Sequence, residues 1–217
     1  RCGECVRRTG FIELFQHTNY SFVKNVSKQV EAVCNTTTRI INMEYVMLDR
    51  IKFEEWLAEP VKDKIKLNTG CNDIIERDNH LEVITDKQII KTKYVILAWG
   101  TNYAIQKKFK LLKDVPALIP CVGGIFDNKL DSTKISFYFD NQTQSSVWTF
   151  PKGNKVNAGI GIYPNSDINL NELFKTRIKE LKLNGQQTFG GVFPTTGPIR
   201  KTFTQQMLVC GDAAGLT

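Results

Sequence analysis

One stretch of the sequence decides the fold: Met207-Leu208-Val209-Cys210-Gly211-Asp212-Ala213-Ala214-Gly215-Leu216-Thr217. An apolar run that is typical of a β-strand ends there at Gly211-Asp212, and the small residues after it predict the start of a helix. Gly lets the backbone approach a ligand, and a helix N-terminus presents free N–H groups to an anion. Asp212 at this junction can accept hydrogen bonds from a polyol or ribose. Because the sequence stops where the helix would begin, we expect this chain to be part of a larger protein.

The composition is that of an ordinary globular protein. With 217 residues, 41% hydrophobic and 24% charged, the chain is long enough to bury a core and suits one or two domains. No apolar run approaches the ~18 residues of a membrane span, and the basic start lacks the apolar core of a signal peptide. We therefore expect a cytoplasmic protein, unless the relevant end is missing. No nucleic-acid-binding motif is present, and we expect no nucleic-acid partner.

The net charge of +7 comes from lysines spread along the chain, which predicts a solvated basic surface. One segment is denser, because Lys107-Lys108-Phe109-Lys110-Leu111-Leu112-Lys113 interleaves cations with apolar residues. Such a segment could rest against an anionic membrane surface as a peripheral contact. The alternative, which the pattern alone favours, is a solvated helix with one buried side.

The six cysteines predict neither a disulfide scaffold nor a metal site. Most lie in apolar, strand-like runs, where free Cys behaves as a small buried hydrophobe, and their spacing is irregular. Cys2-Gly3-Glu4-Cys5 is a CxxC motif, but zinc would need a second pair and a redox centre would need a following helix. We expect no metal.

Two further junctions resemble Gly211-Asp212. Asp49 follows a short apolar strand and is placed to cap a helix that reaches residues 62–64. Residues 94–98 are almost wholly apolar, which predicts a strand buried on both faces, and this strand ends at Trp99-Gly100. Ligands of open α/β sheets bind at the carboxyl ends of strands, so the three junctions together predict one ligand site. Arg50 could reach a diphosphate there, although a surface arginine at a helix start is the alternative.

The second half of the chain predicts an antiparallel sheet. Its regularly spaced β-branched and aromatic runs are residues 119–126, 134–139, 146–150 and 156–163. An amphipathic helix is predicted over residues 170–183, with Asn169 as its cap and one face of the sheet as its partner. Elsewhere, we expect a loop over residues 1–9, hairpins formed by residues 29–35 with 39–42 and by 81–85 with 88–91, and an irregular passage over 190–198.

The most unusual motif is Trp148-Thr149-Phe150-Pro151, followed after seven residues by Gly159-Ile160-Gly161. Aromatic side chains on a strand next to Gly positions make an apolar wall beside the space that missing side chains leave. Such a wall suits a long hydrocarbon ligand, which binds through apolar area at about 25 cal/mol per Å². The alternative, favoured by the motif without its context, is a sheet core with a Gly-containing turn.

Taken in order, these features resemble the geranylgeranyl reductase family of flavoproteins, within the p-hydroxybenzoate hydroxylase-like group. The resemblance rests on the Cys-Gly-Glu opening, Leu48-Asp49-Arg50 with Phe53 and Leu57, Trp-x-Phe-Pro followed by Gly-x-Gly, and Gly-Asp-Ala-Ala-Gly. It covers essentially the whole chain. Gly-Asp-Ala-Ala-Gly is shared widely among such flavoproteins, whereas Trp-x-Phe-Pro is more particular to the reductases.

The resemblance implies a FAD site and a prenyl pocket. The residues implied to bind FAD are Arg50, Cys71, Gly100, Gly211, Asp212, Ala213, Ala214 and Gly215. Among them, Asp212 would hold the ribityl chain, Arg50 would contact the diphosphate or ribose, and Cys71 would meet the adenine through its backbone. Cys2 matches the family's cysteine beside the active site and would be catalytic. The prenyl pocket would be shaped by Trp148, Phe150, Pro151, Gly159 and Gly161.

The sequence departs from the family pattern in four places. The N-terminal strand with its Gly-rich FAD fingerprint and the helix after Gly215 are both absent, so we expect a fragment or a truncated gene. Trp99 stands where relatives usually carry Asp, in a sequence that contacts the cofactor. Ser146 stands where an aromatic residue commonly precedes the Trp of the motif.

The expected fold is mixed α/β (α+β). An incomplete Rossmann-like FAD-binding domain of residues 1–18, 45–115 and 203–217 would be interleaved with a substrate-binding antiparallel-sheet domain of residues 19–44 and 116–202, which carries one helix.

The implied activity is a FAD-dependent reduction of C=C bonds in geranylgeranyl (isoprenoid) chains, within membrane-lipid or prenyl-compound biosynthesis, with NADPH or ferredoxin as electron donor. Its partner would be an isoprenoid lipid substrate. Two alternatives stay open: a flavin-dependent monooxygenase of the wider group, and a truncated, non-catalytic homologue that binds lipid or a partner. The sequence does not give the oligomeric state.

Overall fold

A computed structural model describes residues 3–127, 129–164, 166–185 and 187–216. The chain forms two units, each made of two separate stretches. Unit 1 comprises Arg1–Pro60 and Pro120–Gly191, and unit 2 comprises Val61–Ile119 and Val192–Thr217. The assignment of separate cofactor and substrate domains, with the boundaries expected above, stays a prediction.

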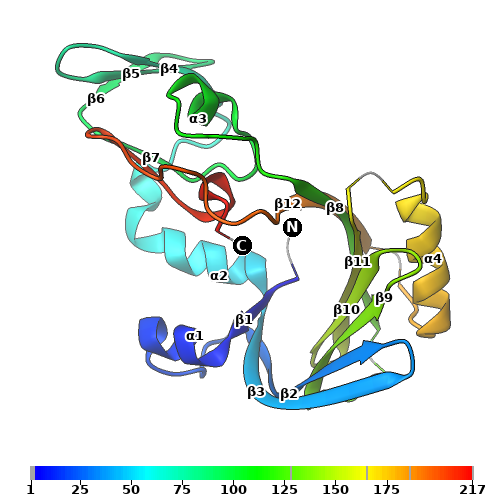
Figure 1. Ribbon diagram of the computed structural model, residues 1–217. Helices are drawn as coiled ribbons and strands as arrows, with labels where there is room; N and C mark the ends of the chain where they lie inside the picture. The colour runs from blue at the N-terminus through cyan, green and yellow to red at the C-terminus, as the bar shows by residue number, and fades with distance from the viewer. Residues whose placement is uncertain (1–2, 128, 165, 186, 217) are drawn as a thin grey trace. The chain divides into compact units, whose positions relative to one another are not determined.

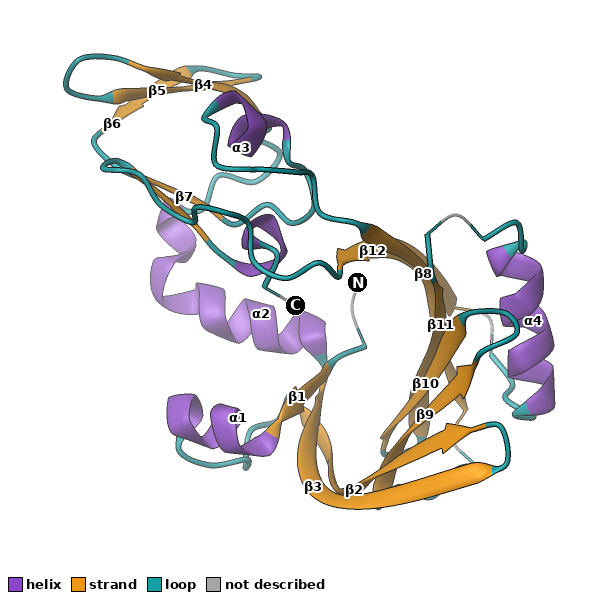
Figure 2. Ribbon diagram, in the orientation of Figure 1, coloured by secondary structure: helices purple, strands orange, loops and turns teal. Residues whose placement is uncertain are grey.

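Unit 1 is built on a curled eight-stranded sheet (Figures 1 and 2). Its strands are β1 (Cys5–Arg7), β2 (Val23–Cys34), β3 (Thr37–Leu48), β8 (Leu118–Asp127), β9 (Lys134–Asp140), β10 (Ser145–Lys152), β11 (Lys155–Ile162) and β12 (Gln187–Pro194). They lie in the order β1-β3-β2-β9-β10-β11-β8-β12. The β2–β9 pair is parallel, whereas the neighbours from β9 to β8 are antiparallel, as the sequence predicts.

Two tight turns set the register of this sheet. Cys34 pairs with Thr37 and Lys152 pairs with Lys155, so each hairpin has a two-residue loop. Asn35 and Gly153 adopt positive φ angles of 52° and 68°, which such loops require and which Asn and Gly accept most readily. The predicted hairpin of β2 and β3 is confirmed, although its strands are longer than expected.

Helix α4 (Leu170–Glu180) covers one face of this sheet (Figure 1). Asn169 caps it, since its side chain accepts hydrogen bonds from the backbone N–H groups of Asn171 and Glu172. Phe174 is buried against Val122, Phe126, Val156, Ala158 and Ile160 of the sheet. The predicted cap and the predicted packing are both confirmed.

The first 60 residues add a second helical layer to unit 1. Helix α1 (Arg8–Phe15) and helix α2 (Arg50–Ala58) share an aromatic cluster of Phe11, Phe15, Tyr20, Phe22, Phe53 and Trp56. Asp49 caps α2 through the N–H of Lys52, and a 3-10 helix (Glu59–Lys64) continues it to the predicted end. The loop expected over residues 1–9 is wrong, because β1 pairs with β3 from Cys5 onward and α1 begins at Arg8.

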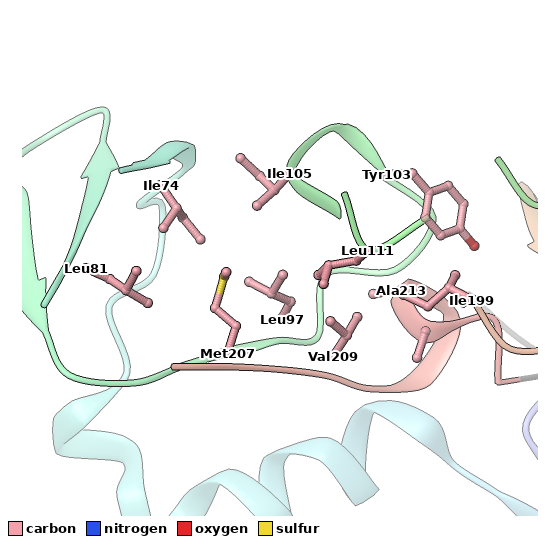
Figure 3. Close-up of a cluster of buried hydrophobic side chains, with 11 residues drawn as sticks. Ile74, Leu81, Leu97, Tyr103, Ile105, Leu111, Ile199, Met207, Val209 and Ala213 are labelled. Atoms are coloured by element: carbon pink, nitrogen blue, oxygen red, sulfur yellow. The ribbon is translucent and has the colours of Figure 1, made fainter. Parts of the chain in front are cut away.

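Unit 2 contains two small sheets and a short helix. β4 (Cys71–Glu76), β5 (Leu81–Thr85) and β6 (Ile89–Thr92) are antiparallel, which confirms the second predicted hairpin. β7 (Val95–Leu97) and β13 (Met207–Val209) pair in parallel, and α3 (Ala104–Lys108) packs beside them. Figure 3 shows the core that joins these elements, with Leu97, Met207, Val209 and Ala213 among its members.

The strand at residues 94–98 was expected to be buried on both faces, and this is wrong for the described residues. Leu97 is buried in the unit 2 core, but Ile96 is 66% exposed and Tyr94 is 70% exposed. Alternate residues of a strand point to opposite faces, and only one face of the β7–β13 pair packs against the core. The irregular passage expected at residues 190–198 is also partly wrong, because β12 extends to Pro194.

The lysine-rich segment has the buried side that its favoured interpretation predicts, but the predicted helix is wrong, because residues 109–113 are not helical. Helix α3 ends at Lys108, whose ammonium lies 2.6 Å from the Asp73 carboxylate, and Leu111 is buried. Among the described residues, no helix combines the length and the apolar character needed to cross a membrane.

Candidate functional site

The last strand and its glycine turn lie in unit 2, and the predicted strand that ends at Gly211 is confirmed. β13 runs parallel to β7, and the Cys210 N–H donates to the carbonyl of Leu97 at 3.0 Å, so Trp99-Gly100 and Gly211 both follow the carboxyl ends of neighbouring strands. Gly100 and Gly211 have φ angles of 79° and 59°. A Cβ built on either glycine meets nothing within 4 Å, so the backbone is open to a ligand at both positions.

The turn after β13 is held rigidly. Residues Gly211–Ala214 form a single 3-10 turn rather than the start of a longer helix, and Gly215 ends it in the left-handed region. The Tyr103 hydroxyl donates to the carbonyl of Asp212 at 2.8 Å, and the buried Gln106 amide donates to the carbonyl of Ala213 at 3.0 Å. A Cβ on Gly215 would lie 2.4 Å from the carbonyl oxygen of Gly197, so only Gly fits there.

The Asp212 side chain stays available while its backbone is fixed. Its residue is half-buried, and no side-chain hydrogen bond of Asp212 is found within the part of the chain that the structure describes. Burial raises the pKa of Tyr103, and the nearby Asp212 carboxylate adds to this effect, so Tyr103 is a neutral hydrogen-bond donor at this turn.

Two other residues predicted to bind the cofactor, Cys71 and Arg50, belong to other elements, and Trp99 precedes Gly100. Cys71 opens β4 in the antiparallel sheet of unit 2, where its exposed thiol donates to the carbonyl of Asp73 at 3.6 Å. Arg50 belongs to unit 1 and opens α2, and its guanidinium Nε donates to the Glu54 carboxylate at 2.6 Å. Trp99 is half-buried against the unit 2 core, and its indole N–H has no partner among the described residues.

The Trp-x-Phe-Pro motif lies on the central strand β10 of unit 1. Trp148 and Phe150 point to the same side of the sheet, with ring centroids 6.4 Å apart, and Phe137 of β9 packs 5.5 Å from Phe150. The opposite, α4-covered side takes Val147. We call Phe137, Trp148, Phe150 and Gly159 the Trp148 wall.

Two glycines allow the aromatic rings of the wall to pack closely against the backbone. Gly159 on β11 pairs directly with Trp148, and a Cβ there would lie 2.1 Å from the indole ring. Gly3 meets the wall from the N-terminal loop, where a Cβ would lie 2.5 Å from the Phe150 ring. The structure thus brings the Cys-Gly-Glu loop and the Trp-x-Phe-Pro motif together, although Cys2 itself lies outside the described residues.

Pro151 and Gly161 extend the same two strands. Both residues are buried, and Gly161 pairs with Ser146, two residues beyond the pair of Gly159 with Trp148. Sequence reasoning missed Phe137 and Gly3. The alternation of Ile135, Phe137 and Phe139 along a strand was the available signal for Phe137, but only strand pairing places it beside Phe150.

Two open cavities of unit 1 lie away from the wall. One, of about 480 Å³, is lined by residues including Tyr138, Asp140, Val147 and Arg177, and the other, of about 570 Å³, by residues including Arg7, Lys28 and Glu44. Neither includes a residue of the Trp148 wall. Within the described residues, no group of three His, Cys, Asp or Glu side chains could hold a metal ion.

Known proteins similar to this chain were found by sequence and by structure. No family model matches the chain. Digeranylgeranylglycerophospholipid reductase of Methanocaldococcus jannaschii is 33% identical over 195 residues, which cover 78% of this chain and 48% of that protein. The protein of the same name from Methanococcus vannielii is 29% identical, over 99% of this chain and 60% of its own length. The chain therefore spans about half of the length of these relatives.

Among solved structures, a geranylgeranyl bacteriochlorophyll reductase-like protein of Thermoplasma acidophilum superposes with a TM-score of 0.84 at 20% identity, over 100% of this chain and 62% of that one. The expected mixed α/β fold is thereby confirmed. The chain matches the geranylgeranyl reductase family of flavoproteins over the part of those proteins that it spans, which confirms the resemblance.

Proposed function

We propose that this protein is a FAD-dependent reductase that saturates C=C bonds of geranylgeranyl or related isoprenoid chains in lipid biosynthesis. The names of its relatives support the proposal, and the observation that carries it is the Trp148 wall. The two stacked rings lie over a bare glycine: Phe150 is buried in a core cluster with Val30, Met47 and Ile135, and the half-buried Trp148 would offer the apolar contact for a hydrocarbon chain. The polar indole N–H of Trp148 is already bonded to Asn157.

The turn after β13 fits FAD. Gly100 and Gly211 leave open backbone at neighbouring strand ends, and the Asp212 carboxylate can accept hydrogen bonds from the hydroxyls of the ribityl chain. Gly211 and the residues from Ala213 to Gly215 would approach the diphosphate and flavin. Arg50 and Cys71 would contribute at the diphosphate and the adenine. Reduced FAD, when bound, supplies the hydride that an alkene must receive.

On the substrate side, the task of the chain's own residues is positioning. An isolated alkene is a poor hydride acceptor, so it must be held in a fixed place while water is excluded. Trp148, which is half-buried and packs on the buried Phe150, would present the apolar contact, and such contact contributes about 25 cal/mol per Å² to binding a prenyl chain. Gly159 and Gly3 allow the two rings to pack closely against the backbone.

Saturation also needs a proton at the second alkene carbon, and Cys2 is our candidate for arranging its delivery. Gly3, its neighbour in the sequence, packs against Phe150 of the wall. Replacing Cys2 by Ala should abolish most turnover and leave FAD binding unchanged. Near-normal turnover of Cys2→Ala would remove this residue from the mechanism.

The experiment that tests the proposed function combines an absorbance scan with product analysis. The purified protein is expected to carry a yellow chromophore and, with NADPH or reduced ferredoxin under anaerobic conditions, to convert a geranylgeranyl lipid to a saturated product. A hydroxylated product that needs oxygen would instead identify a monooxygenase. Bound lipid with neither flavin nor turnover would identify a non-catalytic homologue.

A further inference from the structure

A buried polar network stands behind the Trp148 wall. The Lys152 ammonium pairs with Oε2 of Glu4, and only 11% and 12% of these two side chains are exposed. Asn157, which is fully buried, donates from Nδ2 to the same Glu4 oxygen at 3.3 Å. Its Oδ1 accepts the indole N–H of Trp148 at 3.0 Å. The network therefore runs from an ion pair, through one amide, to the aromatic ring of the wall.

Glu4 connects this network to two further segments. Its backbone carbonyl accepts the N–H of Leu48 at 2.8 Å, and its Oε1 accepts the N–H of Arg50 at 3.4 Å at the start of α2. Glu4 has a φ of 62°, a left-handed conformation that a residue with a Cβ adopts only when its surroundings hold it there. The contacts of its carboxylate and carbonyl supply that restraint.

The chemistry of the four side chains fixes their order. An indole N–H can only donate, so Asn157 must offer it the amide oxygen. The amide NH₂ group then points to an acceptor, and the Glu4 carboxylate is one. Lys152 neutralises that carboxylate, which would otherwise be a costly unpaired charge at this depth. Each member thus determines how the next is oriented.

Packing alone does not fix the orientation of the Trp148 indole ring. Gly159 and Phe150 restrict its height above the sheet, but an aromatic ring can still slide or rotate within an apolar contact. The hydrogen bond to Asn157 removes that freedom. An ion pair buried in this way is weak support for stability, since a hydrophobic replacement is often neutral or better. Its better-supported role here is orientation.

We propose that Glu4, Lys152 and Asn157 are positioning residues. They lock the Trp148 ring in one orientation, and through Glu4 they tie the Cys-Gly-Glu loop to the Trp148 wall. The functional consequence, that a prenyl chain meets a fixed surface beside that loop, rests on the proposed function. The orientation of Trp148 itself does not depend on it.

The test measures solvent exchange of the Trp148 indole N–H by ¹H–¹⁵N NMR, with the signal assigned from Trp148→Phe. Asn157→Leu, close in shape, removes the acceptor, and the exchange rate is expected to rise about tenfold or more as the hydrogen bond is lost. Lys152→Met should raise it as well, whereas Lys152→Arg should restore it. Asn154→Leu, in the exposed turn of the same hairpin, is the matched control and should change nothing.

Unchanged exchange of the Trp148 indole in Asn157→Leu would overturn the proposal, and so would equal effects of Lys152→Met and Lys152→Arg. If Asn157→Leu does not fold, the two Lys152 variants decide. In the active protein, Lys152→Met should raise KM for the prenyl lipid severalfold with its flavin content unchanged. An unchanged KM would overturn the link to substrate. If neither the parent protein nor any variant reduces prenyl lipids, the proposed function is wrong. The exchange rates of the Trp148 indole N–H would still test whether Glu4, Lys152 and Asn157 orient the ring.

Discussion

At the scale of single residues, Gly159 shows how a missing side chain builds the wall. The Trp148 ring occupies the place where a Cβ would stand, 2.1 Å away. Gly159→Ala should force the indole off its position and lower the free energy of unfolding by about 1–3 kcal/mol, the usual cost of overpacking. Urea denaturation measures this change.

Gly10→Ala is the matched control for that substitution. A Cβ on Gly10 meets nothing within 4 Å, and Gly10 lies inside α1, where Ala is the better helix former. It should leave stability unchanged or raise it by about 0.5–1 kcal/mol. Equal midpoints for the two variants would show that the indole does not rest on Gly159.

Asp212 is the residue on which the proposed cofactor site depends most. In the proposed site its carboxylate would accept hydrogen bonds from the ribityl hydroxyls, and a hydrogen bond to a charged group contributes about 1.5–3 kcal/mol. Asp212→Ala should therefore weaken FAD binding by about tenfold or more, as measured by fluorescence titration. The fold should persist, since Tyr103 contacts the backbone of Asp212 and not its side chain.

Asp114→Ala removes an exposed carboxylate of the same unit and serves as the comparison. It should bind FAD as the parent does. An Asp212→Ala protein with the same affinity as Asp114→Ala would mean that FAD, if bound, is held by other residues.

At the scale of elements, the predictable features are those with a local cause. Asn169 caps α4 with two backbone hydrogen bonds. Asn169→Ala should lower the free energy of unfolding by about 1 kcal/mol because those N–H groups lose their acceptor. Asn171→Ala, at an exposed position of the same helix, should be neutral or stabilising. Circular dichroism during denaturation measures both, and a cap variant as stable as Asn171→Ala would contradict the expectation.

The elements that sequence reasoning missed depend on distant partners. Alternation and caps identified the hairpins, α2 and α4, since these signals lie within a few residues. β1 was missed because only pairing with Tyr45, Val46 and Met47 makes it a strand. The apolar run at β7 predicted burial on both faces, but which faces are covered depends on neighbours that the run itself does not specify.

The residues of the candidate site also fall into two groups, those with a local sequence signal and those that depend on distant partners. Gly211-Asp212, and Trp148 with Gly159, could be recognised as motifs from the sequence. Glycine, aspartate and aromatic residues at those spacings indicate particular kinds of ligand site. The Glu4–Asn157 contact joins residues far apart in the sequence, and the residues near either one carry no pattern that predicts this contact. Such contacts follow from strand register, which places β10 beside β11 and the N-terminal loop beside both.

At the scale of the whole molecule, the many lysines act on stability through a few carboxylates. The Lys108 ammonium, aided by the Ile74 N–H, lowers the pKa of Asp73, and Arg77 and Lys155 lower those of Glu82 and Asp127. Lys134 behaves oppositely, since its hydrogen bond with Glu31 raises the pKa of the ammonium. A basic chain thus has paired charges in both of its units.

These shifts predict a window of stability. A carboxyl group with a lowered folded pKa stabilises the fold above its unfolded pKa, near about 4, and this contribution is lost as the pH falls through the folded value. Lys134, with a raised pKa, contributes fully below about 10.4 and loses its contribution as the pH rises through its folded value. The free energy of unfolding should therefore fall on both sides of a broad plateau, as urea denaturation across the pH range would show.

Part of the acid side of that window can be assigned to the pair of Lys108 and Asp73. Replacing Lys108 by Met removes the cation beside Asp73, so the pKa of Asp73 should rise toward its ordinary value. The plateau stability would then be lower than in the parent, and the part lost on acidification would be smaller, because less of the native preference for the ionised carboxylate remains. Carboxyl NMR titration reads the pKa directly. Lys93→Met, which removes an exposed lysine of the same unit, should leave the Asp73 titration in place, and an identical pKa in both variants would show that Lys108 does not hold Asp73 in solution.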